Sequence, residues 1–132
     1  MRGNNKRFQL VGYLEKFTIR GNTAHIIERS RRLQVAEQLI VEEGAKVCKI
    51  AVIDKGHKNG NEAHVVYDNG VVKIYNERTG KFITVLIARL PQIERYRINV
   101  PPAMKQKIKS HVEKGLNEIE FCGRAGEMPY QN

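Results

Sequence analysis

The fold is decided by the stretch EAHVVYDNGVVKIYN, residues 62–76, in which two runs of largely apolar residues flank Asn69-Gly70. Asn-Gly between two such runs is the strongest short-range signal for a β-hairpin. A two-residue turn at this point places His64 opposite Tyr75. The segment therefore predicts two antiparallel strands and determines which of their side chains share a face.

Strand signals continue on both sides of this hairpin. The run KVCKIAVID (46–54) precedes it, and KFITVLIAR (81–89) follows the turn ERTG (77–80). Both runs are rich in Val and Ile, which favour strands. The hairpin and its neighbours therefore predict a four-stranded antiparallel meander.

Helix signals lie before and after this meander. Asn22-Thr23 offers a cap for a helix over residues 23–43, which could break into two near Leu33 and ends at Gly44. A last helix runs from Pro101-Pro102 to about residue 115. Residues 8–21 predict a strand or small hairpin. The predicted fold is α+β, with an N-terminal helix or two helices packed on the four-stranded meander and a C-terminal helix.

The 132 residues fit one domain, with residues 1–7 and about 118–132 expected to be flexible. Its apolar runs fall short of the ~20 residues that a membrane-spanning helix needs, and no apolar segment follows the charged N-terminus. Two cysteines are too few for a disulfide framework, and their spacing does not suit zinc. We therefore expect a cytoplasmic protein with no membrane association, no metal and no cofactor.

The charge of the chain points to a polyanionic partner. Twenty-three Lys and Arg against fourteen Asp and Glu leave a net charge of +9. Because each neutralised phosphate releases counterions, this excess favours nucleic acid, although a protein can also be basic without such a partner. The cations occur along the whole chain, so the fold must assemble any binding surface. Among them are Lys55 and Lys58 in the loop DKGHKNGNE, and Lys105, Lys107 and Lys109 near the end.

The predicted register gathers four chemically active side chains on one sheet face: His64, Lys73, Tyr75 and Thr84. The opposite face is almost entirely apolar and is expected to pack against the helices, which leaves the first face uncovered. Histidine exchanges protons near neutral pH, and lysine is a natural phosphate contact. The uncovered face is therefore a candidate catalytic surface, although an ordinary solvated sheet face would show the same pattern.

The first predicted helix offers a second group of candidates. Arg29 falls within its apolar stripe, and His25 and Arg32 lie on the border of that stripe. An inward-facing arginine is costly unless it is paired or lines a cleft. Either Arg29 has a structural partner such as Glu28, or His25 and Arg29 lie at the edge of a phosphate-binding groove. His111, among the lysines of the last helix, is expected at the surface.

The segments AHIIERSRR (24–32) and NEAHVVYDNGVVKIYNERTGKFITVLIAR (61–89) together resemble small phage- and toxin-associated domains. Those domains are related to the RelE/barnase-like superfamily of metal-independent endoribonucleases. The resemblance covers about residues 23–97 and implies helices on one sheet face, with RNA bound against the other. His25, Arg29 and Thr84 match its His-x-x-Glu-Arg helix and Ile-Thr-Val strand, whereas the Pro-Pro helix and the C-terminal tail depart from it.

Three hypotheses of function follow. In the first, the protein is a toxin-type endoribonuclease in which His25 or His64 takes the proton of the ribose 2′-hydroxyl and Tyr75 or the other histidine protonates the leaving oxygen. In the second, it is a non-catalytic phage-type regulator that binds DNA or RNA. For the nucleic-acid partner in general, RNA is favoured over DNA. In the third, it inhibits a host enzyme by binding an acidic patch. The expected protein partner is an antitoxin or a host enzyme. The residues assigned to phosphate or nucleic-acid binding are Arg29, Arg32, Lys73, Lys55 and Lys58.

Overall fold

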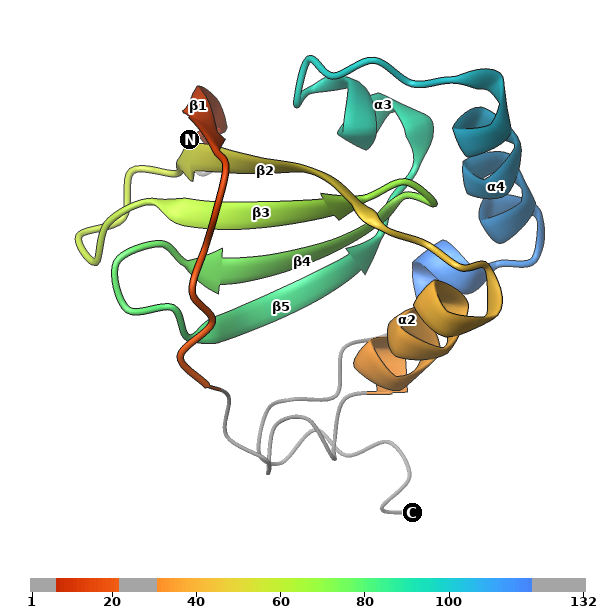
Figure 1. Ribbon diagram of the computed structural model, residues 1–132, viewed down its shortest axis with the longest axis horizontal. Helices are drawn as coiled ribbons and strands as arrows, with labels where there is room; N and C mark the ends of the chain where they lie inside the picture. Colours follow the sequence, from red (N-terminus) through yellow and green to blue (C-terminus); the bar gives the residue numbers. More distant parts are fainter. Residues whose placement is uncertain (1–6, 22–30, 120–132) are drawn as a thin grey trace.

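The structure, a computed structural model, describes residues 7–21 and 31–119. Its centre is a five-stranded antiparallel sheet in which the strands follow one another in the order β1-β2-β3-β4-β5 (Figure 1). The strands are β1 (Gln9–Leu14), β2 (Val47–Asp54), β3 (Glu62–Tyr67), β4 (Val71–Asn76) and β5 (Phe82–Ile87). The described helices are α2 (Arg31–Glu42), α3 (Leu90–Glu94) and α4 (Pro102–Glu113), followed by the 3₁₀ turn η1 (Leu116–Glu118).

The predicted four-stranded meander behind an N-terminal helix is wrong. β1 comes before α2 and pairs antiparallel with β2, with Tyr13 opposite Ala51, so the sheet gains a fifth strand. The Tyr13 hydroxyl also donates a hydrogen bond to the Tyr96 carbonyl at 2.7 Å. The alternating pattern of residues 8–21 indicates a strand but cannot indicate its partner, because that partner lies beyond α2 in the sequence.

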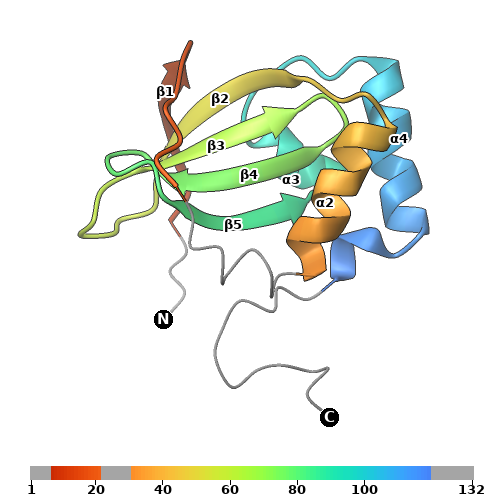
Figure 2. The same ribbon diagram turned by 60° about the horizontal axis from the view of Figure 1, so that its bottom comes forward.

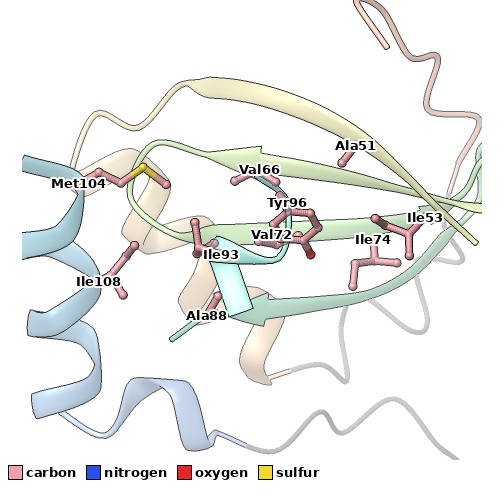
Figure 3. Close-up of a cluster of buried hydrophobic side chains, with 10 residues drawn as sticks. All are labelled: Ala51, Ile53, Val66, Val72, Ile74, Ala88, Ile93, Tyr96, Met104 and Ile108. Carbon is pink, nitrogen blue, oxygen red and sulfur yellow. The ribbon is translucent and has the colours of Figure 1, made fainter. Parts of the chain in front are cut away.

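Helices cover both faces of the sheet, so the prediction of one uncovered face is also wrong (Figure 2). On one face, which we call the α2 face, Leu33 and Ala36 pack against Val85 and neighbouring strand residues. On the other, the α4 face, Ile93 and Ile108 of α3 and α4 pack against the sheet (Figure 3). Each large aliphatic side chain buried in this way contributes about 1.5–3 kcal/mol to folding.

The chain that follows β1, residues 15–21, crosses the sheet on the α2 face (Figure 1). The Phe17 ring lies 5.5 Å from the Tyr75 ring between centroids. The backbone N–H of Arg20 donates to the Gly80 carbonyl at 3.0 Å. This segment and α2 therefore cover different parts of the same sheet face.

The β3–β4 hairpin pairs one residue out of the predicted register. His64 lies opposite Ile74 rather than Tyr75, and Tyr75 lies opposite Ala63. The connection between the strands spans residues 68–70 instead of two residues. Because side chains alternate between the faces of a strand, a one-residue shift on one strand changes which partners share a face.

Contacts with the helices form this longer turn. The Asn69 amide is buried and donates to the Glu43 carboxylate at 2.8 Å, while its oxygen accepts from the Val71 backbone N–H at 3.3 Å. Gly70 has a φ of +88°, and a Cβ at this position would lie 2.6 Å from Ile108 Cγ1. The turn is therefore determined by its contacts with α2 and α4, which the local Asn-Gly preference does not contain.

The helix predictions agree with the structure in part. The C-terminal helix is confirmed as α4. Helix α2 confirms the second half of the predicted helix 23–43 and ends before Gly44, whose φ is +61°. Residues 22–30 of that prediction lie outside the described residues. Helix α3 was not predicted. Pro91 follows the last predicted strand directly, and in the structure it lies in the first turn of α3. None of the described helices is long and apolar enough to cross a membrane.

Candidate functional site

The four residues predicted to share one sheet face are divided between the two faces. His64 of β3 and Thr84 of β5 pair with Ile74 of β4 from its two neighbouring strands. Paired residues share a face, and Ile74 belongs to the core of the α4 face, so both residues are on that face. Lys73 and Tyr75 occupy the alternate positions of β4 and are on the α2 face. The predicted gathering of all four is therefore wrong. The extra turn residue separates His64 from Lys73 and Tyr75, and a register shift between β4 and β5 puts Thr84 on the His64 face.

His64 lies at the centre of a buried hydrogen-bond network. Its side chain is only 2% exposed. The Nε2 atom lies 2.8 Å from Glu62 Oε1, and Nδ1 lies 2.6 Å from the Tyr96 hydroxyl. Because an ionised carboxylate can only accept, Nε2–H donates to Glu62 and Nδ1 accepts from the Tyr96 O–H. This network connects β3 to the chain that follows α3.

Burial governs the titration of this network. Burial lowers the pKa of His64, and the hydrogen bond to Glu62 offsets only part of that effect. Burial would raise the pKa of Glu62, but the hydrogen bond from His64 and nearby cationic groups such as Lys55 together outweigh it, so this pKa is lowered. Burial also raises the pKa of Tyr96 well above its usual range. His64 is therefore held neutral between an ionised carboxylate and a protonated phenol.

Aromatic and cationic groups close the network on its outer side. The Phe8 ring packs edge-on against His64 at 5.9 Å and against Tyr96 at 5.6 Å between centroids. The Arg95 guanidinium lies 4.0 Å from the centre of the Phe8 ring, a cation–π arrangement. With Phe8 in this position, the His64 ring does not meet a ligand at the surface, and its contacts are structural.

Lys73 and Tyr75 have partners on the α2 face. The Lys73 ammonium lies 2.5 Å from Glu37 Oε2 on α2, and 5.5 Å from the centre of the Tyr67 ring. Burial lowers the pKa of Lys73, but the hydrogen bond and charge of Glu37, together with Tyr67 and Tyr75, outweigh that effect, so the pKa is raised. Burial raises the pKa of Tyr75, whose side chain packs between Phe17 and the sheet. Lys73 is therefore a fully charged lysine whose charge is balanced by a carboxylate.

The other predicted residues lie in separate places. His25 and Arg29 lie outside the described residues. Arg32 is half-buried in the first turn of α2. Lys55 and the exposed Lys58 belong to the β2–β3 loop, which lies at the opposite end of the sheet from α4 (Figure 1). Among described residues, the predicted set therefore provides the Lys73–Tyr75 pair but no convergent catalytic group.

His111 was expected at the surface but is buried, with 1% of its side chain exposed. Its Nε2 lies 2.9 Å from Glu43 Oε2, and the same carboxylate accepts the Asn69 amide. This contact joins α4, the end of α2 and the hairpin turn, which is a structural role. Within residues 7–21 and 31–119, no three His, Cys, Asp or Glu side chains converge to hold a metal ion.

The positive charge is concentrated in the segment that contains α3 and α4. Residues 89–114 carry seven Lys and Arg against two Glu, a net charge of +5 out of +9 for the whole chain. Three of these cations, Arg89, Lys105 and Lys109, line one pocket of about 530 Å³ between α3 and α4. The lysines of the last helix are evident in the sequence. The position of Arg89 beside them is not, because α3 was not predicted.

The pocket between α3 and α4, which we call the cationic cleft, combines an apolar floor with a charged rim. Leu90, Pro91, Ile108 and Val112 form the floor. Lys105 and Lys109 are exposed one helical turn apart on α4. The Arg89 guanidinium lies 3.5 Å from Glu118 and keeps 52% of its side chain exposed. Such a rim can contact several phosphates of one strand.

Comparison with known proteins gave no relatives: no family model matches the chain, and neither do the curated proteins or the solved structures.

Proposed function

We propose that this protein binds nucleic acid, RNA in preference to DNA, and that the cationic cleft contacts the phosphates. The observation that carries the proposal is the net charge of +5 on residues 89–114, with three cations around one pocket. Attraction between such a surface and a polyanion is strengthened by counterion release. The preference for RNA comes from the resemblance to RelE/barnase-like domains.

The arrangement around His64 argues against cleavage by the predicted route. A general base must lie within hydrogen-bond reach of the ribose hydroxyl that it deprotonates. His64 is 2% exposed, and both ring nitrogens already have protein partners. Lys73, assigned to the phosphate, lies on the opposite sheet face and is paired with Glu37. The proposal is therefore binding without His64 as a general base.

Salt dependence gives the first test. Three phosphate contacts to a single strand predict that log affinity falls with log salt concentration with a slope of about −2. We would measure the affinity of a fluorescently labelled 12-nucleotide RNA, and of the matching DNA, by anisotropy over a range of salt concentrations. An affinity that does not change with salt contradicts the proposal.

A charge-matched pair of double variants locates the surface. Lys105→Gln with Lys109→Gln should weaken RNA binding severalfold and reduce the slope to about −0.7, because one phosphate contact remains. Lys55→Gln with Lys58→Gln removes the same charge at the other end of the sheet and should change the affinity much less. Equal losses in the two double variants would mean that net charge alone attracts RNA, and would overturn the assignment to the cleft.

A further inference from the structure

Another pocket lies on the α2 face, between α2, strands β4 and β5, and the segment of residues 15–21. Its volume is about 520 Å³, which lies in the range of roughly 300–1,000 Å³ typical of small-molecule sites. Its apolar lining consists of Ile19, Leu33, Tyr75 and Phe82. We call it the Lys73 pocket, because Lys73 and Glu37 provide its charged groups.

The two charged groups of this pocket have capacity for a ligand. Their contact uses one N–H of Lys73 and the Oε2 atom of Glu37. An ammonium carries three N–H donors, and a carboxylate has two accepting oxygens with several lone pairs. Lys73 is deeply placed, with 13% of its side chain exposed, whereas Glu37 is 52% exposed. A ligand can therefore accept from Lys73 and donate to Glu37 at the same time.

The order of these groups favours one nucleobase. Guanine presents the O6 acceptor beside the N1–H and N2–H donors along one edge, so O6 can accept from Lys73 while both donors bind Glu37. Adenine, cytosine and uracil each have at most one donor beside an acceptor on that edge. Guanine therefore makes one more hydrogen bond to a charged group than the other bases do.

The walls of the pocket suit a planar ring. Tyr75 and Phe82 lie 5.8 Å apart between ring centroids and meet edge to face. Tyr75 is 3% exposed and its ring also packs against Phe17, so these side chains form an apolar wall for a base, which adds affinity without selectivity. An isolated phosphate is a poor fit, because Glu37 balances the charge of Lys73.

From these observations we infer that the Lys73 pocket binds a guanine base, with Lys73 donating to O6 and Glu37 accepting from N1–H and N2–H. The same chemistry is offered by a free guanine nucleotide and by a guanine in an RNA strand. The inference does not depend on the cationic cleft, which lies between α3 and α4 on the other face of the sheet.

Calorimetric titration with GMP, IMP and AMP tests the inference, because the three nucleotides have the same phosphate and differ only in the base. IMP lacks the N2 amine, so GMP should bind about tenfold more tightly than IMP, the value of one hydrogen bond to a charged group. In Glu37→Gln this ratio should fall below about twofold. In the control Glu42→Gln, an exposed α2 residue outside the pocket, it should stay near tenfold.

A guanine preference that survives Glu37→Gln would overturn the inference, and so would the absence of any guanine preference both among the free nucleotides and between the pentanucleotides UUGUU and UUAUU. The pentanucleotides separate the two sources of guanine. A preference for UUGUU without a preference among free nucleotides assigns the pocket to RNA, and a preference in both formats means that it accepts either. The Lys105→Gln and Lys109→Gln double variant should keep the GMP to IMP ratio, so failure of the cleft and failure of the pocket are distinguishable.

Discussion

Replacing Tyr96 with Phe removes one hydroxyl from the middle of the protein and leaves the ring in place. That hydroxyl donates to His64 Nδ1 at 2.6 Å, and both side chains are only 2% exposed. Without it, Nδ1 is a buried acceptor with no partner, because water does not reach this position. The loss of a partner from a buried polar atom costs about 1–3 kcal/mol. We expect Tyr96→Phe to lower the free energy of unfolding by this amount.

Tyr13→Phe is the matched control, because it makes the same chemical change at the sheet edge. The Tyr13 hydroxyl donates to the Tyr96 carbonyl at 2.7 Å, and Tyr13 is 42% exposed. Water can replace the lost bond there, so the cost should stay below about 1 kcal/mol. Urea unfolding followed by circular dichroism gives both values by linear extrapolation. If Tyr96→Phe costs no more than Tyr13→Phe, the buried hydrogen bond to His64 does not stabilise the fold as described.

Two further predictions concern stability. Gly70→Ala places a Cβ against Ile108 at a positive φ and should lower the free energy of unfolding by about 2–4 kcal/mol. In the control Gly44→Ala, φ is +61° but the space around the Cβ is open, so the loss should be about 1–2 kcal/mol. Similar losses for the two variants in urea unfolding would contradict the close packing of the turn on α4. Stability should also fall with acidification: burial lowers the pKa of His64 below its usual 6.5, so below that pH the unfolded chain binds a proton that the folded chain does not. The lowered pKa of Glu62 adds a second loss at more acidic pH, below its usual 4.5. The decline between about pH 7.5 and about pH 5.5 should be smaller in His64→Gln, and an unchanged decline in that variant would refute the assignment.

Local signals were sufficient for most of the secondary structure. The alternation of Val and Ile predicted β2 to β5, and the Pro-Pro start predicted α4. Gly44, at a φ of +61°, ends α2 as its sequence position suggested. Each of these signals acts within one element, where short-range sterics and hydrogen bonding decide the conformation.

The pairing of distant elements could not be predicted in the same way. β1 has a recognisable strand pattern, but its partner β2 follows α2 in the chain, so nothing local shows that a fifth strand joins the sheet. The covering of the α4 face depends on α3, whose first turn contains Pro91. Proline is a signal both for the end of a strand and for the start of a helix.

The predicted neighbourhood of His64 and Lys73 depended on a single turn. Asn69-Gly70 suggested a two-residue hairpin, whereas the contact between Asn69 and Glu43 stabilises a three-residue connection. Because Glu43 follows α2 and is distant from the hairpin in the sequence, no pattern within the hairpin contains this contact. As a result His64 and Lys73, predicted as neighbours on one face, lie on opposite faces of the sheet, and the concentration of charge near α4 became the more informative feature.

The hydrogen bond from Tyr13 to the Tyr96 carbonyl has a consequence for synthesis of the protein. The first strand leaves the ribosome early, yet its edge contact requires a residue 83 positions later in the chain. Contacts between such distant positions form slowly, because the entropy cost of closing a long loop must be met before the contact can stabilise the chain. During translation β1 therefore has no partner strand until β2 has emerged, and its Tyr13 contact forms only after the segment following α3 has been made. The interval before β2 pairs with it is when the nascent chain is most exposed to association with other strands.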